Sequence, residues 1–200
     1  MIAIIDDGGS FTYNIVQLVG TLGAEPVVLS ADGACLAALE ALRPRGIIMA
    51  SAVGTPDGAG AGAAVVGRWA ERAVLLGVGS GLRCVASSFG ARFVRSVSPM
   101  HGKASAVIHD GTGLLEGVPS PFRAIRYDSF VADPSTLPAC LRVTARAEDT
   151  GEIMALRHVS LSVEAVQFHP ESAFTEHGRR IMENFVTATG AVRDTGRVNR

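Results

Sequence analysis

The chain has 200 residues, of which 48% are hydrophobic and 18% charged, and its formal net charge is −1 at pH 7. This apolar content can bury the core of one ordinary domain and excludes intrinsic disorder. A near-neutral balance without a basic tract lacks the electrostatic footprint of a nucleic-acid-binding or anionic-membrane-binding protein. No apolar run is long enough to span a bilayer, and no basic segment precedes the first predicted strand. We therefore expect a cytoplasmic protein with no membrane or nucleic-acid partner.

The first part of the chain predicts strands that alternate with helices. Continuous apolar runs, typical of buried parallel strands, occupy residues 2–6, 25–29, 46–49 and 74–78. Helical spacing follows Ser10, a predicted N-cap, and recurs over residues 35–42 and 63–72. This alternation predicts a doubly wound sheet whose right-handed crossovers bring three loops to the carboxyl edge of the strands, where such sheets bind ligands. Those loops are residues 7–9, 50–54 and 79–81.

The second part of the chain changes character. Residues 104–109, 124–127, 141–147 and 153–157 predict shorter and more exposed strands, whereas residues 163–168 again predict a buried one. An amphipathic helix is predicted over residues 174–187. We therefore predict an α/β fold with a doubly wound, mostly parallel sheet flanked by helices, and a smaller mixed or antiparallel sheet from the middle of the chain. Residues 1–190 are expected to form a single domain, followed by a flexible tail over residues 191–200.

Several segments together resemble the class I glutamine amidotransferases, most closely the small glutaminase subunits of anthranilate synthase and aminodeoxychorismate synthase. The likeness covers residues 2–185 in the family's order and implies that family's flavodoxin-like fold. The matching pieces are Ser10-Phe11-Thr12-Tyr13-Asn14, Gly54-Thr55-Pro56-Asp57, His101-Gly102-Lys103 with Ser105, Pro121-Phe122, Arg126-Tyr127 with Ser129, Glu152-Ile153-Met154, Val166-Gln167-Phe168-His169-Pro170-Glu171-Ser172 and Glu176-His177-Gly178.

The resemblance also implies a catalytic site that this chain does not complete. In the family, a cysteine at a strand-to-helix turn, within Gly-x-Cys-x-Gly-His-Gln, is activated by the histidine and glutamate of a His-Pro-Glu loop. The resemblance assigns the latter two roles to His169 and Glu171. Here the turn reads Gly77-Val78-Gly79-Ser80-Gly81-Leu82-Arg83, so Gly79 stands at the nucleophile position. Because thioester chemistry needs a thiolate, the resemblance implies that glutaminase activity is absent.

Other departures surround the same predicted site. Arg83 stands where the family has a glutamine that contacts the ligand, and Ala52 lies in Ser51-Ala52-Val53-Gly54, in place of the family's Pro-Gly-Pro-Gly oxyanion loop. Ser80 is one position late for a replacement nucleophile, and Cys84 is five residues past the turn, where a small core residue is expected. His169 and Glu171 thus remain a general-base pair without a nucleophile, kept either for residual chemistry or for the geometry of their loop.

The glycines of the turn leave two interpretations of ligand binding. A dinucleotide site is excluded because the turn follows a later strand and has no acidic residue at the expected distance. A small-anion site remains open: bare amides at Gly79, Ser80 and Gly81, together with Ala52 and the cation of Arg83, suit a carboxylate or phosphate. The alternative is that Arg83 pairs with a surface acid. Neither the cysteines nor the histidines have metal-ligand spacing, so no metal and no cofactor are expected.

Three functional interpretations follow. The first is a pseudoenzyme, a non-glutaminase subunit that supports or regulates a chorismate-using or other ammonia-dependent synthase. The second is an enzyme with a repurposed pocket, in which His169 and Glu171 act as base and orienting group on a small anionic substrate. The third is a sensor of small carboxylates that reports to a partner. Homodimer and heteromer stay open, and so does the identity of any partner.

Overall fold

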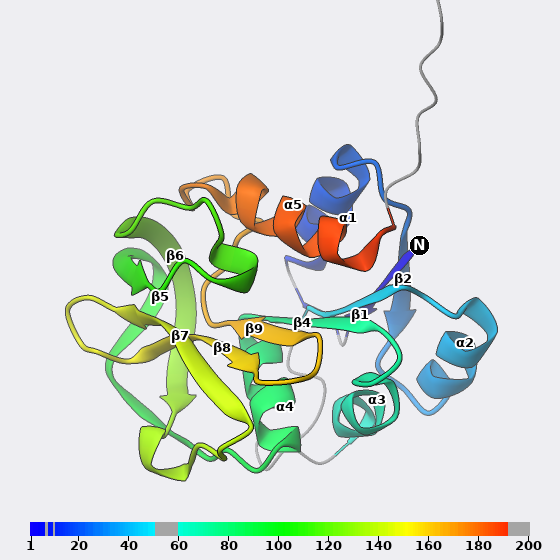
Figure 1. Cartoon of the computed structure of the whole chain (residues 1–200), viewed down its shortest axis with the longest axis horizontal. Helices are drawn as coiled ribbons and strands as arrows, with labels where there is room; N and C mark the ends of the chain where they lie inside the picture. The colour runs from blue at the N-terminus through cyan, green and yellow to red at the C-terminus, as the bar shows by residue number, and fades with distance from the viewer. Residues whose placement is uncertain (7, 10, 51–59, 192–200) are drawn as a thin grey trace, which may run out of the picture.

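The computed structural model describes residues 1–6, 8–9, 11–50 and 60–191, and these form nine strands and five α-helices (Figure 1). Five strands run parallel, in the order β2-β1-β3-β4-β9. Their bounds are β1 Ile2–Asp6, β2 Pro26–Ser30, β3 Gly46–Met49, β4 Val74–Val78 and β9 Val163–Val166. The helices are α1 Thr12–Thr21, α2 Cys35–Leu42, α3 Ala61–Trp69, α4 Ser80–Ser88 and α5 Gly178–Thr189.

The antiparallel strands extend the parallel ones within a single sheet. After β9 the order continues β8-β7-β5-β6, and each of these neighbouring pairs is antiparallel. The smaller sheet expected from the middle of the chain is therefore joined edge to edge to the doubly wound half. The bounds are β5 Phe93–His109, β6 Phe122–Ala132, β7 Leu141–Ala147 and β8 Ile153–His158, with short 3₁₀ turns at Gly113–Leu115 and Pro134–Thr136.

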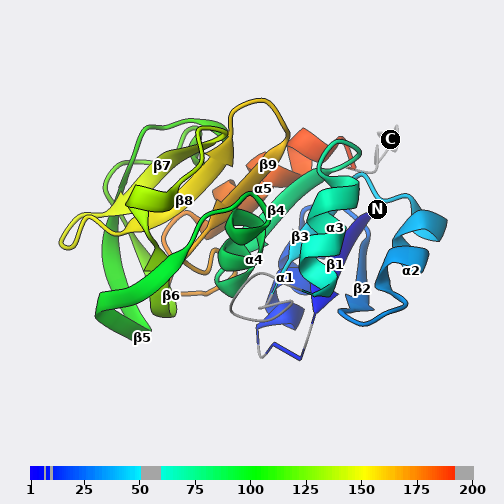
Figure 2. The same ribbon diagram turned by 90° about the horizontal axis from the view of Figure 1, so that it is seen from below.

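Helices cover both faces of the parallel strands. Because successive side chains of a strand point to opposite faces, Ile2 and Ile4 pack with α1 and α5, whereas Ala3 and Ile5 pack with α2, α3 and α4. Figure 1 shows this layering, with α1 and α5 above the strands and the other three helices below them. Viewed from below, α3 and α4 lie across the parallel strands, and the antiparallel half extends beyond α4 (Figure 2).

Several predicted boundaries shift, each for a local reason. The strand expected at residues 104–109 begins already at Phe93, because bulges between Arg95 and Lys103 let the chain stay paired with β6 through an irregular stretch. The last helix begins at Gly178 because the residues before it form turns, in which the N–H of Thr175 donates to the carbonyl of Ser172. The predicted N-cap Ser10 and the tail beyond Ala191 lie outside the described residues, and the single domain over residues 1–190 stays a prediction.

The antiparallel half of the sheet curls so that β6 contacts the segment that follows β9. Arg126 on β6 forms an isolated bridge with Phe168, and the N–H of His169 donates to the carbonyl of Ile125 at 3.0 Å. The hydroxyl of Thr175 donates to the carbonyl of His169 at 2.7 Å and accepts from the N–H of Ile125 at 3.0 Å. These bonds fix the backbone of His169 beside the carboxyl end of β4, at the edge where the sequence placed the site.

Candidate functional site

Glycine is required by close backbone contacts at two positions of the turn from β4 into α4, Gly77 and Gly81, and by the backbone conformation at the position between them. A Cβ on Gly77 would lie 2.6 Å from the carbonyl oxygen of Gly81, and one on Gly81 would overlap the carbonyl oxygen of Met49. Gly79 itself has φ +59° and ψ −118°, a conformation that is strained for any residue with a side chain. Its N–H donates to the carbonyl of Val166 at 2.9 Å, which ties the turn to the neighbouring strand. The chain is therefore held in a sharp turn at Gly79.

His169 and Glu171 form a close and almost fully buried pair. Nδ1 of His169 lies 2.6 Å from Oε1 of Glu171, with side-chain exposures of 10% and 1%. A carboxylate only accepts hydrogen bonds, so Nδ1 donates to Glu171, and Nε2 is the ring nitrogen that presents a lone pair whenever the ring is neutral. The rings of Phe11 and Tyr127 pack against the imidazole, each with a centroid distance of 5.4 Å. Carboxylate and aromatic contacts together fix the orientation of this base.

The two halves of the predicted site meet. A Cβ placed on Gly79 would lie 2.7 Å from Nε2 of His169, so the basic nitrogen points at the position from which a side chain would project. Ser80 begins α4, one residue beyond this point. Cys84 is 6% exposed and belongs to the core between the sheet and α3 and α4, as its sequence position predicted. The structure thus brings together Gly79, His169 and Glu171.

A small pocket of about 80 Å³ lies beside this pair, between the start of α4 and β6. Its lining combines polar groups with two aromatic side chains: Ser80, Arg83, Tyr127, Asp128, Ser129, Phe130 and Gln167. Of the predicted anion site, Ser80 and Arg83 line this pocket, whereas Gly79 and Gly81 do not. Ala52, the remaining predicted member, lies outside the described residues, as does the rest of the 51–54 loop.

Comparison with known proteins identifies the family of this chain. The family profile described as "Glutamine amidotransferase class-I" matches residues 3–189. The chain belongs to the class I glutamine amidotransferase family. It is 46% identical over 190 residues to anthranilate synthase component 2 of Azospirillum brasilense, covering 94% of this chain and 96% of that protein. It is 42% identical over 186 residues to aminodeoxychorismate synthase component 2 of Escherichia coli K12, covering 93% and 99%. The resemblance expected from the sequence is confirmed.

A solved structure supports the fold of this family. A putative GMP synthase subunit from Thermoplasma acidophilum superposes with a TM-score of 0.82 at 23% sequence identity, covering 96% of this chain and 95% of that one. The α/β fold predicted from the sequence is thus confirmed. Among the described residues, no helix is long and apolar enough to cross a membrane. Within the same residues, no three His, Cys, Asp or Glu side chains are grouped as metal ligands.

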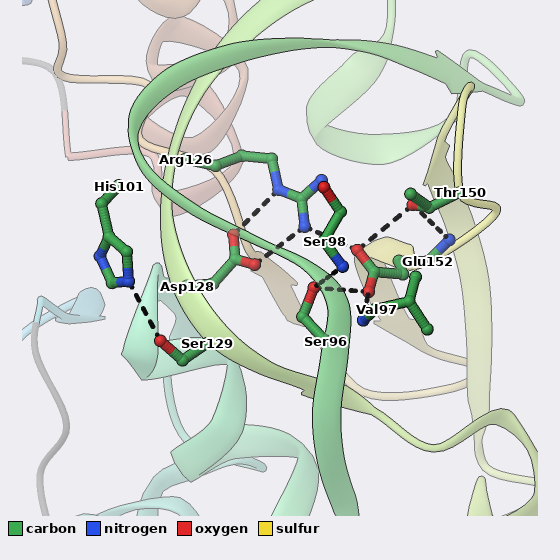
Figure 3. A network of polar contacts seen from close by, with 9 residues as sticks. All are labelled: Ser96, Val97, Ser98, His101, Arg126, Asp128, Ser129, Thr150 and Glu152. Atoms are coloured by element: carbon green, nitrogen blue, oxygen red, sulfur yellow. Dashed lines mark hydrogen bonds and ion pairs between the residues drawn. The ribbon is translucent and has the colours of Figure 1, made fainter.

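This amidotransferase chain also contains a buried ionic cluster that sequence reasoning missed (Figure 3). Arg126 is 0% exposed and donates from Nε and Nη2 to both oxygens of Asp128, at 2.9 and 2.8 Å. The same Nη2 donates to Glu152 at 2.8 Å. Glu152 also accepts from the hydroxyl of Ser96 and the N–H of Val97, which belong to β5. The cluster joins β5 and β6 to the start of β8. Two segments quoted for the resemblance contain Arg126 and Glu152, but nothing in the sequence indicates that they pair.

The contacts within the cluster favour the charged forms of Glu152 and Arg126. Burial by itself raises the pKa of Glu152, but hydrogen bonds from Ser96 and Arg126 outweigh it, so the net pKa lies below the ordinary glutamate range. Burial lowers the pKa of Arg126, and its bonds to Asp128 and Glu152 more than offset this, so its pKa is raised. The carboxylate of Glu152 and the guanidinium of Arg126 therefore stay ionised at neutral pH, in a part of the protein that is nearly closed to water.

Proposed function

We propose that this family member is a non-glutaminase subunit that supports or regulates a chorismate-using synthase working on free ammonia. The observation that carries the proposal is Gly79, which presents no side chain to the base aimed at it. Amide hydrolysis in this family proceeds through a thioester, which requires a nucleophilic sulfur at that point of the turn. The ring of His169 also occupies the space next to it, since Nε2 lies 2.7 Å from the Cβ position.

The partner in this proposal is drawn from the relatives. Anthranilate synthase component 2 and aminodeoxychorismate synthase component 2 are named as components of larger synthases, and this chain matches them over nearly their whole length. Exposed aromatic side chains on segments that flank His169 support a docking role, because apolar groups of this size are costly to leave in water. Tyr127 is 40% exposed, Tyr13 66% and Phe174 80%. In the same region, Nε2 of His101 lies 3.2 Å from the hydroxyl of Ser129 (Figure 3).

The test is glutamate release from glutamine by the purified chain, alone and with a chorismate-using synthase subunit. We expect no release above the blank in either case, and amination by the complex when ammonium salts are supplied. Co-purification of a larger subunit would agree with this, whereas a homodimer that ignores every synthase would contradict the partner. Clear glutamate release would contradict the lack of a nucleophile and would direct attention to Ser80.

A restored thiol sharpens the test. In Gly79→Cys, the new sulfur would project from the turn beside His169, whose base favours the thiolate. We expect its alkylation by iodoacetamide at pH 7 to be at least roughly tenfold faster than that of Gly67→Cys, which places a thiol in open space on α3. Replacing His169 by Ala should remove the difference. Equal rates in the two thiol variants would show that His169 does not act on this position.

The hydrogen-bonded pair of His169 and Glu171 supports a second candidate function. His169 and Glu171 are still bonded at 2.6 Å, so they could activate water toward a small anionic substrate held in the adjacent pocket. Turnover of a small ester or amide that is lost in His169→Ala would support this candidate over the non-catalytic subunit.

A further inference from the structure

The guanidinium of Arg126 has donors that its hydrogen bonds within the ionic cluster do not use (Figure 3). Nε donates to Asp128, and Nη2 donates to Asp128 and to Glu152. A guanidinium carries five N–H groups, so the two on Nη1 remain. Nη1 is buried and has no hydrogen-bond partner among the described residues. An unpaired donor of a buried charged group costs folding free energy, so this atom calls for a partner.

Ser105 is a second buried group without a partner, and it lies on the same face of the sheet. It is 7% exposed, and its hydroxyl makes no hydrogen bond to a described residue. The register of β5 and β6 pairs Ser105 with Ala124 and Lys103 with Arg126. Because paired residues share a face and every second residue of a strand returns to it, Ser105 and Arg126 are diagonal neighbours on one face. Such neighbours lie about 7–8 Å apart, so a single small molecule can join the guanidinium and the hydroxyl through two hydrogen bonds of about 2.8 Å each.

The shared face is the interior of the antiparallel half of the sheet. Val107 and Phe122 are paired in the same register and are buried in one core cluster with Phe168. The side chain of Arg126 is itself fully buried. A molecule that bridges Arg126 and Ser105 is therefore enclosed by the core, and it has to be small.

The surroundings favour a neutral molecule over an ion. An anion would accept from Nη1, but it would then lie beside the acidic side chains of Asp128 and Glu152, which already bond to the same guanidinium. A cation would face the positive charge of Arg126. Water accepts from Nη1 and can both donate to and accept from the hydroxyl of Ser105. Buried water molecules typically make about three hydrogen bonds to polar groups that otherwise lack partners.

Two other buried polar atoms without a partner among the described residues lack this arrangement. Nε1 of Trp69 is a single donor on α3, and Oε2 of Glu171 is a single acceptor in the candidate site. Strand pairing places neither of them beside a second unpartnered group of the described chain. Arg126 and Ser105 are set apart because two unpartnered groups with complementary hydrogen bonding share one face.

We propose that one long-lived buried water molecule bridges Nη1 of Arg126 and the hydroxyl of Ser105 and forms part of the ionic cluster. The water completes the hydrogen bonding of Arg126 where the backbone of that residue bridges Phe168, one residue before His169. It therefore supports the framework that holds the base, and it makes no contact with a reacting group. The inference goes beyond the proposed function and is the same whether or not the chain releases glutamate.

The first test is a crystal structure of the full chain, with a second crystal soaked in sodium bromide. We expect density for one water molecule within about 3 Å of both Nη1 of Arg126 and Oγ of Ser105. The bromide crystal should show no anomalous peak at that position, because the neighbouring acidic side chains repel an anion.

The second test counts long-lived water molecules in solution by ¹⁷O magnetic relaxation dispersion. Ser105→Val should lose one such water relative to the unsubstituted chain, because its methyl groups occupy the place of the bridge and cannot bond to it. Thr144→Val is the matched control, since it introduces the same side chain at another buried polar position, 4% exposed on β7. The control should leave the water count unchanged.

Three outcomes would overturn the proposal. These are a crystal structure without density between the two atoms, an anomalous bromide peak there, and an unchanged water count in a folded Ser105→Val. The bromide peak would assign the site to an anion, and the unchanged count would place the water elsewhere. The crystal structure uses the unsubstituted chain, so it decides the question even where Ser105→Val does not fold.

Discussion

The side chains of Glu152 and Glu171 are both buried, but they differ in how many hydrogen bonds their carboxylate oxygens accept. This difference separates a carboxylate that stabilises the fold from one that serves the site. Both oxygens of Glu152 are bonded: Oε1 accepts from Ser96 and Val97, and Oε2 from Arg126 and Thr150. Glu171 uses Oε1 for His169 alone, and its buried Oε2 has no hydrogen-bond partner among the described residues. An unpartnered carboxylate oxygen costs folding free energy. Stability therefore explains Glu152 but not Glu171, whose visible role is to hold a base in place.

Removing Arg126, the cation of the buried ionic cluster, should cause the largest loss in the free energy of unfolding. Arg126→Met would leave the carboxylates of Asp128 and Glu152 buried without their counter-ion, and we expect a loss of about 3–5 kcal/mol in the free energy of unfolding. Urea denaturation measures it. The matched control is Arg142→Met, which breaks a more exposed ion pair with Asp110 and should cost at most about 1 kcal/mol. Equal losses in the two variants would show that the cluster is not a stabilising unit.

Adding a side chain at Gly79 should cause an intermediate loss in the free energy of unfolding. Gly79→Ala forces a residue with a Cβ into φ +59° and against the ring of His169, so we expect it to lower the free energy of unfolding by about 1–3 kcal/mol. Gly67→Ala, at an open position on α3, should be neutral or stabilising by up to about 1 kcal/mol.

A double variant tests the cause of that loss. In Gly79→Ala combined with His169→Ala, relief of the contact should make the total loss smaller than the sum of the two single losses. Additive losses would instead assign the whole effect to the backbone conformation of the turn.

The sequence predicted the parallel half closely, because buried parallel strands are continuous apolar runs; the strands at Gly46–Met49 and Val74–Val78 have the predicted bounds. The antiparallel half was predicted less well. Its longest strand, Phe93–His109, is interrupted by bulges and alternates weakly, so only its last six residues stood out. Its continuity with the parallel strands depends on pairing between distant segments, which local periodicity does not contain.

At the site, too, the sequence predicted the local features but not the contacts between distant segments. The pairing of His169 with Glu171 follows from a local loop, and the resemblance indicated both residues. The contact between His169 and the turn at Gly79, and the bond from Arg126 to Glu152, join segments far apart in the chain. Gln167 was quoted only as part of a motif; its place in the pocket appears once β9 is packed against α4.

The smallest expected change in the free energy of unfolding concerns a third glutamate, Glu164 on β9. Its pKa is shifted in the opposite direction to that of Glu152. Burial raises the pKa of Glu164, and the N–H of Leu114 and the charge of Arg157 offset this only in part. A carboxyl whose pKa is higher in the folded protein stabilises it below the ordinary glutamate pKa, and that stabilisation is lost as the pH rises through the folded value. Glu152, with a lowered pKa, stabilises above the ordinary range and loses this as the pH falls.

Unfolding free energies measured from pH 4 to pH 8 should therefore separate the two glutamates. Relative to the unsubstituted chain, Glu164→Gln should gain stability as the pH rises, by no more than about 1 kcal/mol, because its amide oxygen can still accept from Leu114 without carrying a charge. Glu152→Gln should lose stability in the same direction, because Arg126 then lacks one of its two carboxylates. Parallel pH curves for the two variants would contradict the opposite assignment. The sign of the slope of unfolding free energy against pH thus tests, for each glutamate, which influence dominates. It shows whether hydrogen bonds stabilise the charged carboxylate or burial destabilises it.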